Sequence, residues 1–241
     1  MPNPKLASFD RDGFVIVPDV LPTDLLLQLN EAFSAPIESG LGGIRNVLTT
    51  HGVARATATS GTIQQLLQTV TGEGAFFPVR GILFDKTATP GGVNWKVPYH
   101  QDLSIAVRER PLAPIPAYET WSIKEGVVHV QPPVVILEQL VTVRLHLDPC
   151  DAQTGALRVL SGTHRRGRLS ASEVAQCRAA MMETVCAVPE GGAMVFRPLL
   201  LHASSPATRP GARRRVLHIE FAPVDISLPP GIFWLEEDFR R

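Results

Sequence analysis

The chain has 241 residues and a mass of 26.2 kDa, which fits one domain with a core large enough to fold without disulfides. Lys plus Arg and Asp plus Glu number 23 each, so the formal net charge is zero, which argues against a nucleic-acid partner. Three cysteines without CxxC spacing, no apolar run near the roughly 18 residues that cross a bilayer and no visible secretory signal predict a cytoplasmic protein without a membrane partner.

The first third of the chain mixes one strand with helices. Residues 14–17 (Phe-Val-Ile-Val) form a β-branched run that ends at Pro18. Apolar residues at helical spacing predict one helix from Thr23 or Asp24 to about Phe33 and a second over 62–70, before Gly72. We expect residues 1–75 to buttress a core that follows them.

From residue 76 the pattern changes to short apolar or alternating runs separated by Gly- and Pro-containing turns. Many short strands with such turns are typical of a sandwich or barrel rather than of an alternating βα fold. The sequence contains no linker, so we predict one domain over 1–241, with its β-core over 76–225. The predicted runs are 79–84, 127–130, 134–147, 156–160, 193–201 and 215–221.

The sharpest chemical pattern is His-x-Asp/Glu. On a strand, residues i and i+2 point to the same face, so an imidazole and a carboxylate converge. A second His from a neighbouring strand completes the two-His-one-carboxylate triad that binds one face of Fe(II). With 7 His and 23 acids in 241 residues, chance gives roughly 0.7 matches. The chain has three, which begin at His100, His146 and His218.

Context favours the first of these matches. His100 and Asp102 follow a Pro/Gly-rich loop over 89–98 and precede an alternating apolar run, the placement expected for ligands at the mouth of a barrel. Asp148 precedes a proline at a turn, where Asp serves the backbone. The His218–Glu220 pair fits an exposed or partner-paired strand face.

The remaining ligand must come from far along the chain. His202 ends an apolar run, Ser204 offers a hydroxyl two residues later, and Arg213 opens the last predicted strand. A buried Arg can hold the far carboxylate of a dicarboxylate in a bidentate manner. Strand alternation places Arg213 and Arg215 on one face and Arg214 on the other, so the sequence alone leaves the choice between them open.

Four segments together resemble the phytanoyl-CoA dioxygenase family of Fe(II)- and 2-oxoglutarate-dependent oxygenases, over about residues 9–222. They are 9–17, like the family's opening strand; 98–102 (Pro-Tyr-His-Gln-Asp); 154–165, similar to its "NGxLxxxPGSH" turn and strand; and His202-Ala203-Ser204 with Arg213. One departure is Ala207, which stands where the family often has Asn.

The resemblance implies a fold and a set of cofactors. The fold is mainly β with flanking α, a double-stranded β-helix (a cupin-like jelly roll) with N-terminal helices. The cofactors are Fe(II), 2-oxoglutarate and O₂. The implied residues are His100, Asp102 and His202 for the metal, and Arg213, Ser204 and Lys86 for 2-oxoglutarate.

The implied activity is hydroxylation or desaturation of a small molecule, with release of succinate and CO₂. Asp102 matters here, because related halogenases carry Gly or Ala at that position. The substrate and the oligomeric state stay open, and candidate substrate-binding residues are Trp95, Tyr99, Trp121 and Arg144. The alternative is a non-redox cupin-like metal- or ligand-binding protein or isomerase.

Overall fold

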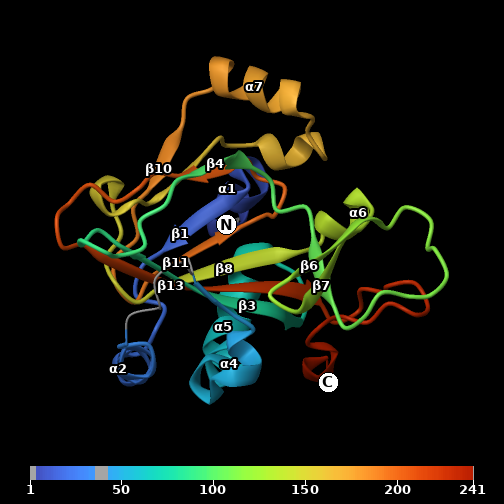
Figure 1. Ribbon diagram of the computed structural model, residues 1–241, viewed down its shortest axis with the longest axis horizontal. Coiled ribbons are helices and arrows are strands. Elements are labelled where there is room, and N and C mark those ends of the chain that lie inside the picture. The colour runs from blue at the N-terminus through green and yellow to red at the C-terminus, as the bar shows by residue number, and fades with distance from the viewer. Residues whose placement is uncertain (1–3, 36–42, 241) are drawn as a thin grey trace.

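Two antiparallel sheets face each other in the computed structural model, which describes residues 4–35 and 43–240 (Figure 1). The larger sheet has six strands in the order β1-β11-β8-β13-β3-β2. Their bounds are β1 (Phe14–Val17), β11 (Ala193–Phe196), β8 (Val141–His146), β13 (Arg213–Pro223), β3 (Phe76–Thr87) and β2 (Gly43–Arg45).

The smaller sheet has four strands in the order β10-β9-β12-β4, and a three-stranded sheet β5-β7-β6 extends one end of the molecule. The bounds are β10 (Thr184–Cys186), β9 (Leu157–Val159), β12 (His202–Ser204), β4 (Val97–His100), β5 (Ile105–Val107), β7 (Val127–Gln131) and β6 (Glu119–Lys124). The class is therefore mainly β with flanking helices, as expected.

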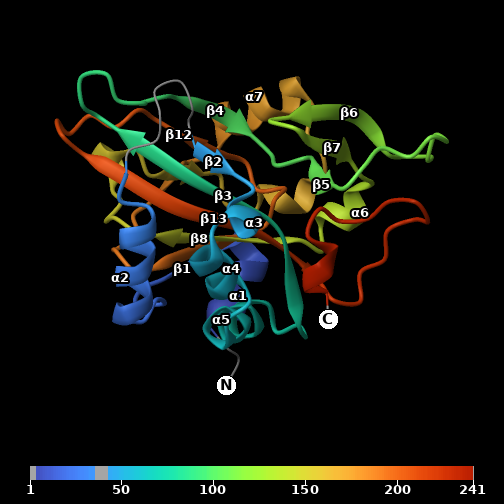
Figure 2. The same cartoon turned by 60° about the horizontal axis from the view of Figure 1, so that its bottom comes forward.

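Helices cover the outer face of the six-stranded sheet (Figure 2). The two amphipathic helices predicted from the sequence are confirmed as α2 and α5, and α5 ends at Gly72, whose φ of 69° is left-handed. The helices are α1 (Pro4–Asp12), α2 (Thr23–Ala32), α3 (Val47–Thr50), α4 (Gly52–Ala58), α5 (Gly61–Thr71), α6 (Val134–Leu137) and α7 (Ala171–Ala180). None of the helices in the described ranges is long and apolar enough to span a bilayer.

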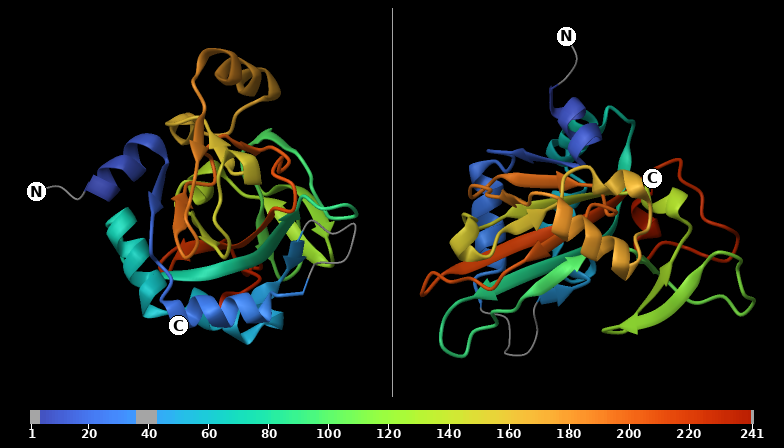
Figure 3. Two further views of the ribbon diagram at one scale, coloured as in Figure 1. Left: turned by 90° about the vertical axis from the view of Figure 1, so that its left-hand side faces the viewer. Right: turned by 90° about the horizontal axis from the view of Figure 1, so that it is seen from above.

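Strand alternation separates the main core from the space between the sheets. On β8, Val141, Val143 and Leu145 pack with the helices in the main apolar cluster. Arg144 and its neighbours at alternate positions point the other way, between the two sheets. Figure 3 shows the helices, the larger sheet and the smaller sheet from two further sides, with α7 outside the smaller sheet.

Several predicted boundaries are wrong. The run 134–147 is split into the short helix α6 and strand β8, because a continuous apolar run does not distinguish strand from buried helix. The run 193–201 ends as a strand at Phe196 and continues as a turn. Residues 9–17 are not one strand: α1 runs to Asp12, and β1 starts after Gly13. The strand β1 lies at the edge of the six-stranded sheet, so residues before 76 also contribute to the sheet.

Candidate metal and dicarboxylate site

Three side chains converge between the sheets, on the smaller sheet's side. Strands β4 and β12 pair antiparallel with His100 directly opposite His202, and Asp102 follows two residues after His100. The Nε2 atoms of His100 and His202 each lie 3.7 Å from a carboxylate oxygen of Asp102. One coordinating atom from each residue lies within 4.8 Å of the others, so the three can hold one metal ion.

Hydrogen bonds from Nδ1 to backbone carbonyl oxygens orient the two imidazole rings and leave Nε2 available to bind a metal. The Nδ1 of His100 lies 2.9 Å from the carbonyl oxygen of Pro98, and that of His202 lies 2.9 Å from the carbonyl oxygen of Leu200. A carbonyl oxygen only accepts, so Nδ1 carries the hydrogen and Nε2 of the neutral ring keeps its lone pair for a metal.

The charge states also suit a divalent metal. Burial lowers the pKa of His202 to about 4, so its ring is neutral at neutral pH. Desolvation raises the pKa of Asp102, but the imidazoles of His202, His218 and His100 outweigh it and hold that pKa below its ordinary value. The Oδ2 atom of Asp102 is buried without a hydrogen-bond partner. Two neutral nitrogens and one anionic oxygen are the donor set of a non-haem Fe(II) triad, so the residues fit that metal.

A cationic group lies beside the triad, with Arg214 in the wall of the same cavity. Lys86 on β3 and Arg214 on β13 are register partners, and both are almost fully buried. The Nζ of Lys86 donates to Ser204 Oγ at 3.2 Å and to the Ser205 carbonyl at 2.7 Å. Burial, together with the charges of Arg214 and Arg144, lowers the pKa of Lys86 to about 7. Neither group forms an ion pair with a carboxylate among the described residues. Arg214 donates to the Gly155 carbonyl and contacts Cys150, so the two cations suit a carboxylate from a bound molecule.

Gly155 shapes this end of the cavity. Its carbonyl oxygen accepts a 2.9 Å hydrogen bond from Arg214, and its φ of 80° is left-handed. A Cβ at this position would lie 2.7 Å from the Ser205 carbonyl oxygen and 3.2 Å from Lys86 Cδ. The Thr154-Gly155 turn therefore needs glycine both for its backbone and for the approach of Lys86.

The cavity joins the triad to the cationic group. Its walls come from both sheets, and the aromatic ring of Trp95 lies 5.0 Å from Lys86 Nζ. The lining residues are Phe84, Trp95, Val97, His100, Asp102, Arg144, Leu157, His202, Ser204, Arg214 and His218.

Arg213 does not line this cavity, contrary to the expectation from the resemblance. Its guanidinium pairs with Asp85 at 2.7 Å and donates to backbone carbonyls after α2, on the helix-covered side of the sheet. Asp85 itself is 3% exposed, so this pair has a structural explanation. Arg214, on the opposite strand face, is the arginine that lines the cavity. Ser204 lines the cavity, and Lys86, which is not itself a lining residue, donates a hydrogen bond to Ser204 Oγ.

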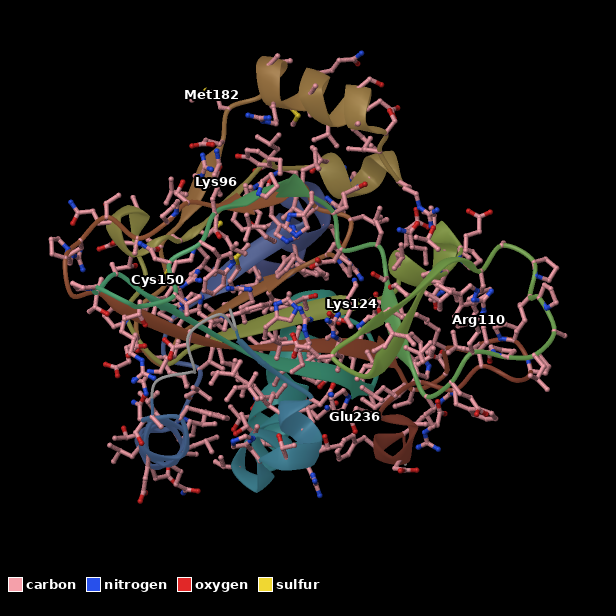
Figure 4. The ribbon with its side chains drawn as sticks, in the orientation of Figure 1. Lys96, Arg110, Lys124, Cys150, Met182 and Glu236 are labelled. Atoms are coloured by element: carbon pink, nitrogen blue, oxygen red, sulfur yellow. The ribbon has the colours of Figure 1, made fainter. Side chains whose placement is uncertain are left out.

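Two of the four candidate substrate residues also lie elsewhere. Tyr99 faces outward, toward a second hollow under α7; its hydroxyl donates to Glu183, and two guanidinium groups, those of Arg158 and Arg178, lie over its ring. Figure 4 shows Lys96, which lines the same hollow, below α7. Trp121 lies on β6 with Arg110 over its ring, away from the triad. Trp95 and Arg144 do line the cavity.

Sequence reasoning missed His218 and Phe84 as lining residues. His218 was expected on an exposed or paired strand face; it is buried, and its ring nitrogens lie near Arg144 and Glu220. The available signal was alternation: His218 shares a strand face with Arg214, and Phe84 shares one with Lys86.

Sequence comparison identifies one family for most of the chain. The profile of the family described as phytanoyl-CoA dioxygenase (PhyH) matches residues 9–216. A comparison with curated protein sequences finds no match.

Solved structures share the fold at low sequence identity. EctD from S. alaskensis, solved with 2-oxoglutarate and 5-hydroxyectoine, is 14% identical, with a TM-score of 0.68 over 95% of this chain and 78% of that one. The α-ketoglutarate-dependent carbocyclase SnoK from nogalamycin biosynthesis is 13% identical, with a TM-score of 0.69 over 96% and 87%. HygX from Streptomyces hygroscopicus, with nickel and 2-oxoglutarate bound, is 13% identical, with a TM-score of 0.65 over 94% and 89%. The likeness confirms the expected jelly-roll architecture.

Proposed function

We propose, for a chain that belongs to the phytanoyl-CoA dioxygenase family, that it is an Fe(II)- and 2-oxoglutarate-dependent oxygenase acting on a small molecule. The observation that carries the proposal is one cavity with a two-His-one-carboxylate triad at one end and buried cations without a counter-anion at the other. That separation of charge suits a metal-chelating dicarboxylate.

The metal would be held by Nε2 of His100, Nε2 of His202 and a carboxylate oxygen of Asp102. When bound there with 2-oxoglutarate, iron(II) supplies the activation of O₂, with conversion of the cosubstrate to succinate and CO₂. These three residues would hold the metal and would leave room for the cosubstrate and O₂ to bind it. The carbonyls of Pro98 and Leu200 orient the two rings through their Nδ1 hydrogens.

The far carboxylate of 2-oxoglutarate would lie on Arg214, with Ser204 and Lys86 beside it. Ser204 lies two residues beyond His202 on the same face of β12, about 6.6 Å along the strand. This spacing is comparable with a five-carbon diacid that reaches from the metal to the cations. Because Arg213 is bound to Asp85 outside the cavity, Arg214 replaces it in this role.

The substrate is expected at the open side of the triad. Trp95 also lines the cavity, but its ring lies 5.0 Å from Lys86 Nζ, at the cationic end. The apolar side chains of Phe84, Val97 and Leu157 exclude water from the reacting groups. Asp102 occupies the position that a halide would need, which favours hydroxylation or desaturation over halogenation. Solved structures with this fold include an α-ketoglutarate-dependent epimerase and an α-ketoglutarate-dependent carbocyclase, so epimerisation or ring closure of the substrate is the second candidate.

The test starts with the protein, Fe(II) and 2-oxoglutarate without oxygen. We expect a visible charge-transfer band, and on admission of O₂ a slow release of succinate that requires all three components. The His202→Ala variant should show neither signal. A wild-type protein that gives no band and no succinate contradicts the proposal. Once a substrate is known, ¹⁸O₂ incorporation into the product separates hydroxylation from the second candidate.

A further inference from the structure

Arg144 is a buried cation that lacks a carboxylate partner. The residue lies on β8, is 5% exposed and lines the cavity. Its Nη1 lies 3.1 Å from Nδ1 of His218, and its Nε is buried without a hydrogen-bond partner. Among the described residues no ion pair involves Arg144, although ten other arginines have one within 4.0 Å. An uncompensated buried charge of this kind lowers the stability of the fold.

The neighbouring carboxylates are already engaged. Glu220 lies beyond the ring of His218, with its Oε1 3.6 Å from His218 Nε2 and 3.0 Å from Arg80 Nη1. The charge of Glu220 is therefore matched by Arg80. Asp102 is the one carboxylate among the residues that line the cavity, and the proposed function assigns it to the metal.

Under the proposed function, on which this step rests, the charges inside the loaded cavity do not balance. A divalent metal, a 2-oxoglutarate dianion and Asp102 together carry one negative charge, which Arg214 cancels. Arg144 then remains positive, and Lys86 adds to the excess whenever it is protonated. The loaded cavity is thus short of at least one negative charge.

Position also separates Arg144 from the cosubstrate's far carboxylate. Arg144 is the register partner of His218, which lies four residues beyond Arg214 on β13, about 13 Å along the strand. The carboxylate that Arg214, Ser204 and Lys86 would hold is therefore centred further along β13, although Arg144 is close enough for its charge to lower the pKa of Lys86. Arg144 lies instead beside His218, and Phe84 places its ring 5.4 Å from the guanidinium carbon.

We infer that Arg144 is a specificity-determining residue that binds an anionic group of the primary substrate, which would make the substrate a small carboxylic acid or an acid of the same charge. The planar guanidinium suits a carboxylate, and the aromatic ring of Phe84 provides an apolar contact for the adjacent carbon atoms. The arginine would be retained at a cost in stability because the substrate supplies the missing charge.

The test compares acids with amides of the same shape. The wild type is loaded anaerobically with Fe(II) and saturating 2-oxoglutarate, and the binding of hexanoate, phenylacetate and benzoate is measured by calorimetry against hexanamide, phenylacetamide and benzamide. We expect at least one acid to bind about tenfold more tightly than its amide, as a charge-assisted pair requires. In Arg144→Gln this preference should disappear, and in Arg144→Lys it should partly remain.

Two further measurements distinguish a substrate-binding role of Arg144 from a role in binding 2-oxoglutarate and from a structural role. At pH 6, where Lys86 is largely protonated with or without Arg144, the affinity for 2-oxoglutarate should change less than about threefold in Arg144→Gln, whereas Arg214→Gln should lose it. The unloaded Arg144→Met variant should melt at a higher temperature than the wild type, because an uncompensated charge has been removed.

The inference is overturned if no acid binds better than its amide, or if Arg144→Gln keeps the preference for acids. It is also overturned if Arg144→Gln weakens the binding of 2-oxoglutarate as much as Arg214→Gln does. A lower melting temperature for Arg144→Met would also overturn it, since Arg144 would then be structural. If the wild type fails to bind 2-oxoglutarate at all, it is the proposed function that fails.

Discussion

Arg213 and Arg214 are consecutive on β13, yet their guanidinium groups lie on opposite faces of the sheet. Arg213 reaches Asp85 and the carbonyls after α2, whereas Arg214 reaches the carbonyl oxygen of Gly155 inside the cavity. Arg213 thus connects the segment after α2 to the sheet, and Arg214 lines the cavity.

Substitution of these two arginines should have separate effects. Arg214→Gln should weaken 2-oxoglutarate binding by on the order of 2–5 kcal/mol, because one partner of a buried charge pair is lost. Arg213→Gln should leave that affinity unchanged but lower the free energy of unfolding by about 1–3 kcal/mol, since Asp85 is left buried and unpaired. Calorimetry and urea unfolding measure the two quantities. A loss of affinity in Arg213→Gln alone would reverse our assignment.

The triad should account for metal binding. His202→Ala and Asp102→Asn should each weaken Fe(II) or Mn(II) binding by more than about 100-fold, since even outer partners of metal ligands contribute about 10–100-fold. Anaerobic titration followed by electron paramagnetic resonance of Mn(II) measures this directly.

His129→Ala is the matched control for those variants. His129 is buried on β7, and its Nδ1 lies 3.0 Å from the Val127 carbonyl, the same arrangement as in the two triad histidines. It lies outside the cluster of coordinating atoms, so its loss should leave metal affinity unchanged. Equal losses in His129→Ala and His202→Ala would contradict the site.

Lys86 should make cosubstrate binding depend on pH. Its pKa is lowered to about 7 by burial and by Arg214 and Arg144, with Cys150 acting in the opposite direction. Above pH 7 the free site is largely neutral at Lys86, and a bound carboxylate should restore the proton. We expect uptake of close to one proton when 2-oxoglutarate binds at about pH 8.5, and falling affinity as pH rises. Calorimetry in buffers of different ionisation enthalpy measures the uptake.

The lowered pKa of Lys86 also makes the free energy of unfolding depend on pH. In the unfolded chain Lys86 has its ordinary pKa of 10.5, so between pH 7 and 10.5 the unfolded state binds more protons than the folded one. The contribution of Lys86 to the free energy of unfolding therefore rises with pH over that range. Lys86→Met should remove both this rise and the proton uptake. Uptake that persists in Lys86→Met would assign it to another group.

Gly155→Ala tests the shape of the cationic end. The Cβ would strain a left-handed backbone and meet Lys86, so we expect a loss of about 1–3 kcal/mol in stability together with weaker 2-oxoglutarate binding. Gly126→Ala is the control, because Gly126 has the same φ of 80° but has nothing within 4 Å of the added Cβ. The control should lose stability alone. Unchanged cosubstrate affinity in Gly155→Ala would show that Lys86 tolerates the displacement.

The sequence predicted His100 and Asp102 as a pair because they are two residues apart, whereas His202 was assigned to the triad through the family resemblance. It also showed that consecutive arginines face opposite ways, but not which face is inside, because that depends on how α2 packs on β13. Tyr99 was misplaced for a related reason. It faces away from its neighbour His100, whereas a register shift between β4 and β12 lets Val97 share the cavity with His100.

The helices α4 and α7 escaped prediction because their apolar periodicity is weak. Helix α7 begins with a capping box between Ser170 and Glu173, but its residues are mostly exposed and only Cys177 is buried. Trp121 was selected as an aromatic near the site, although β6 carries it into a separate sheet. Long-range packing, which single-sequence patterns do not encode, decided these positions.

Among the residues that the structure describes, β4 is the edge strand of the smaller sheet and pairs there with β12 alone. An ion held jointly by His100 and His202 would add a second attachment between these two strands. Metal loading should then slow amide hydrogen exchange over 97–100 more than in the central strands of the larger sheet. The metal centre would thus stabilise an edge strand in addition to its chemical role.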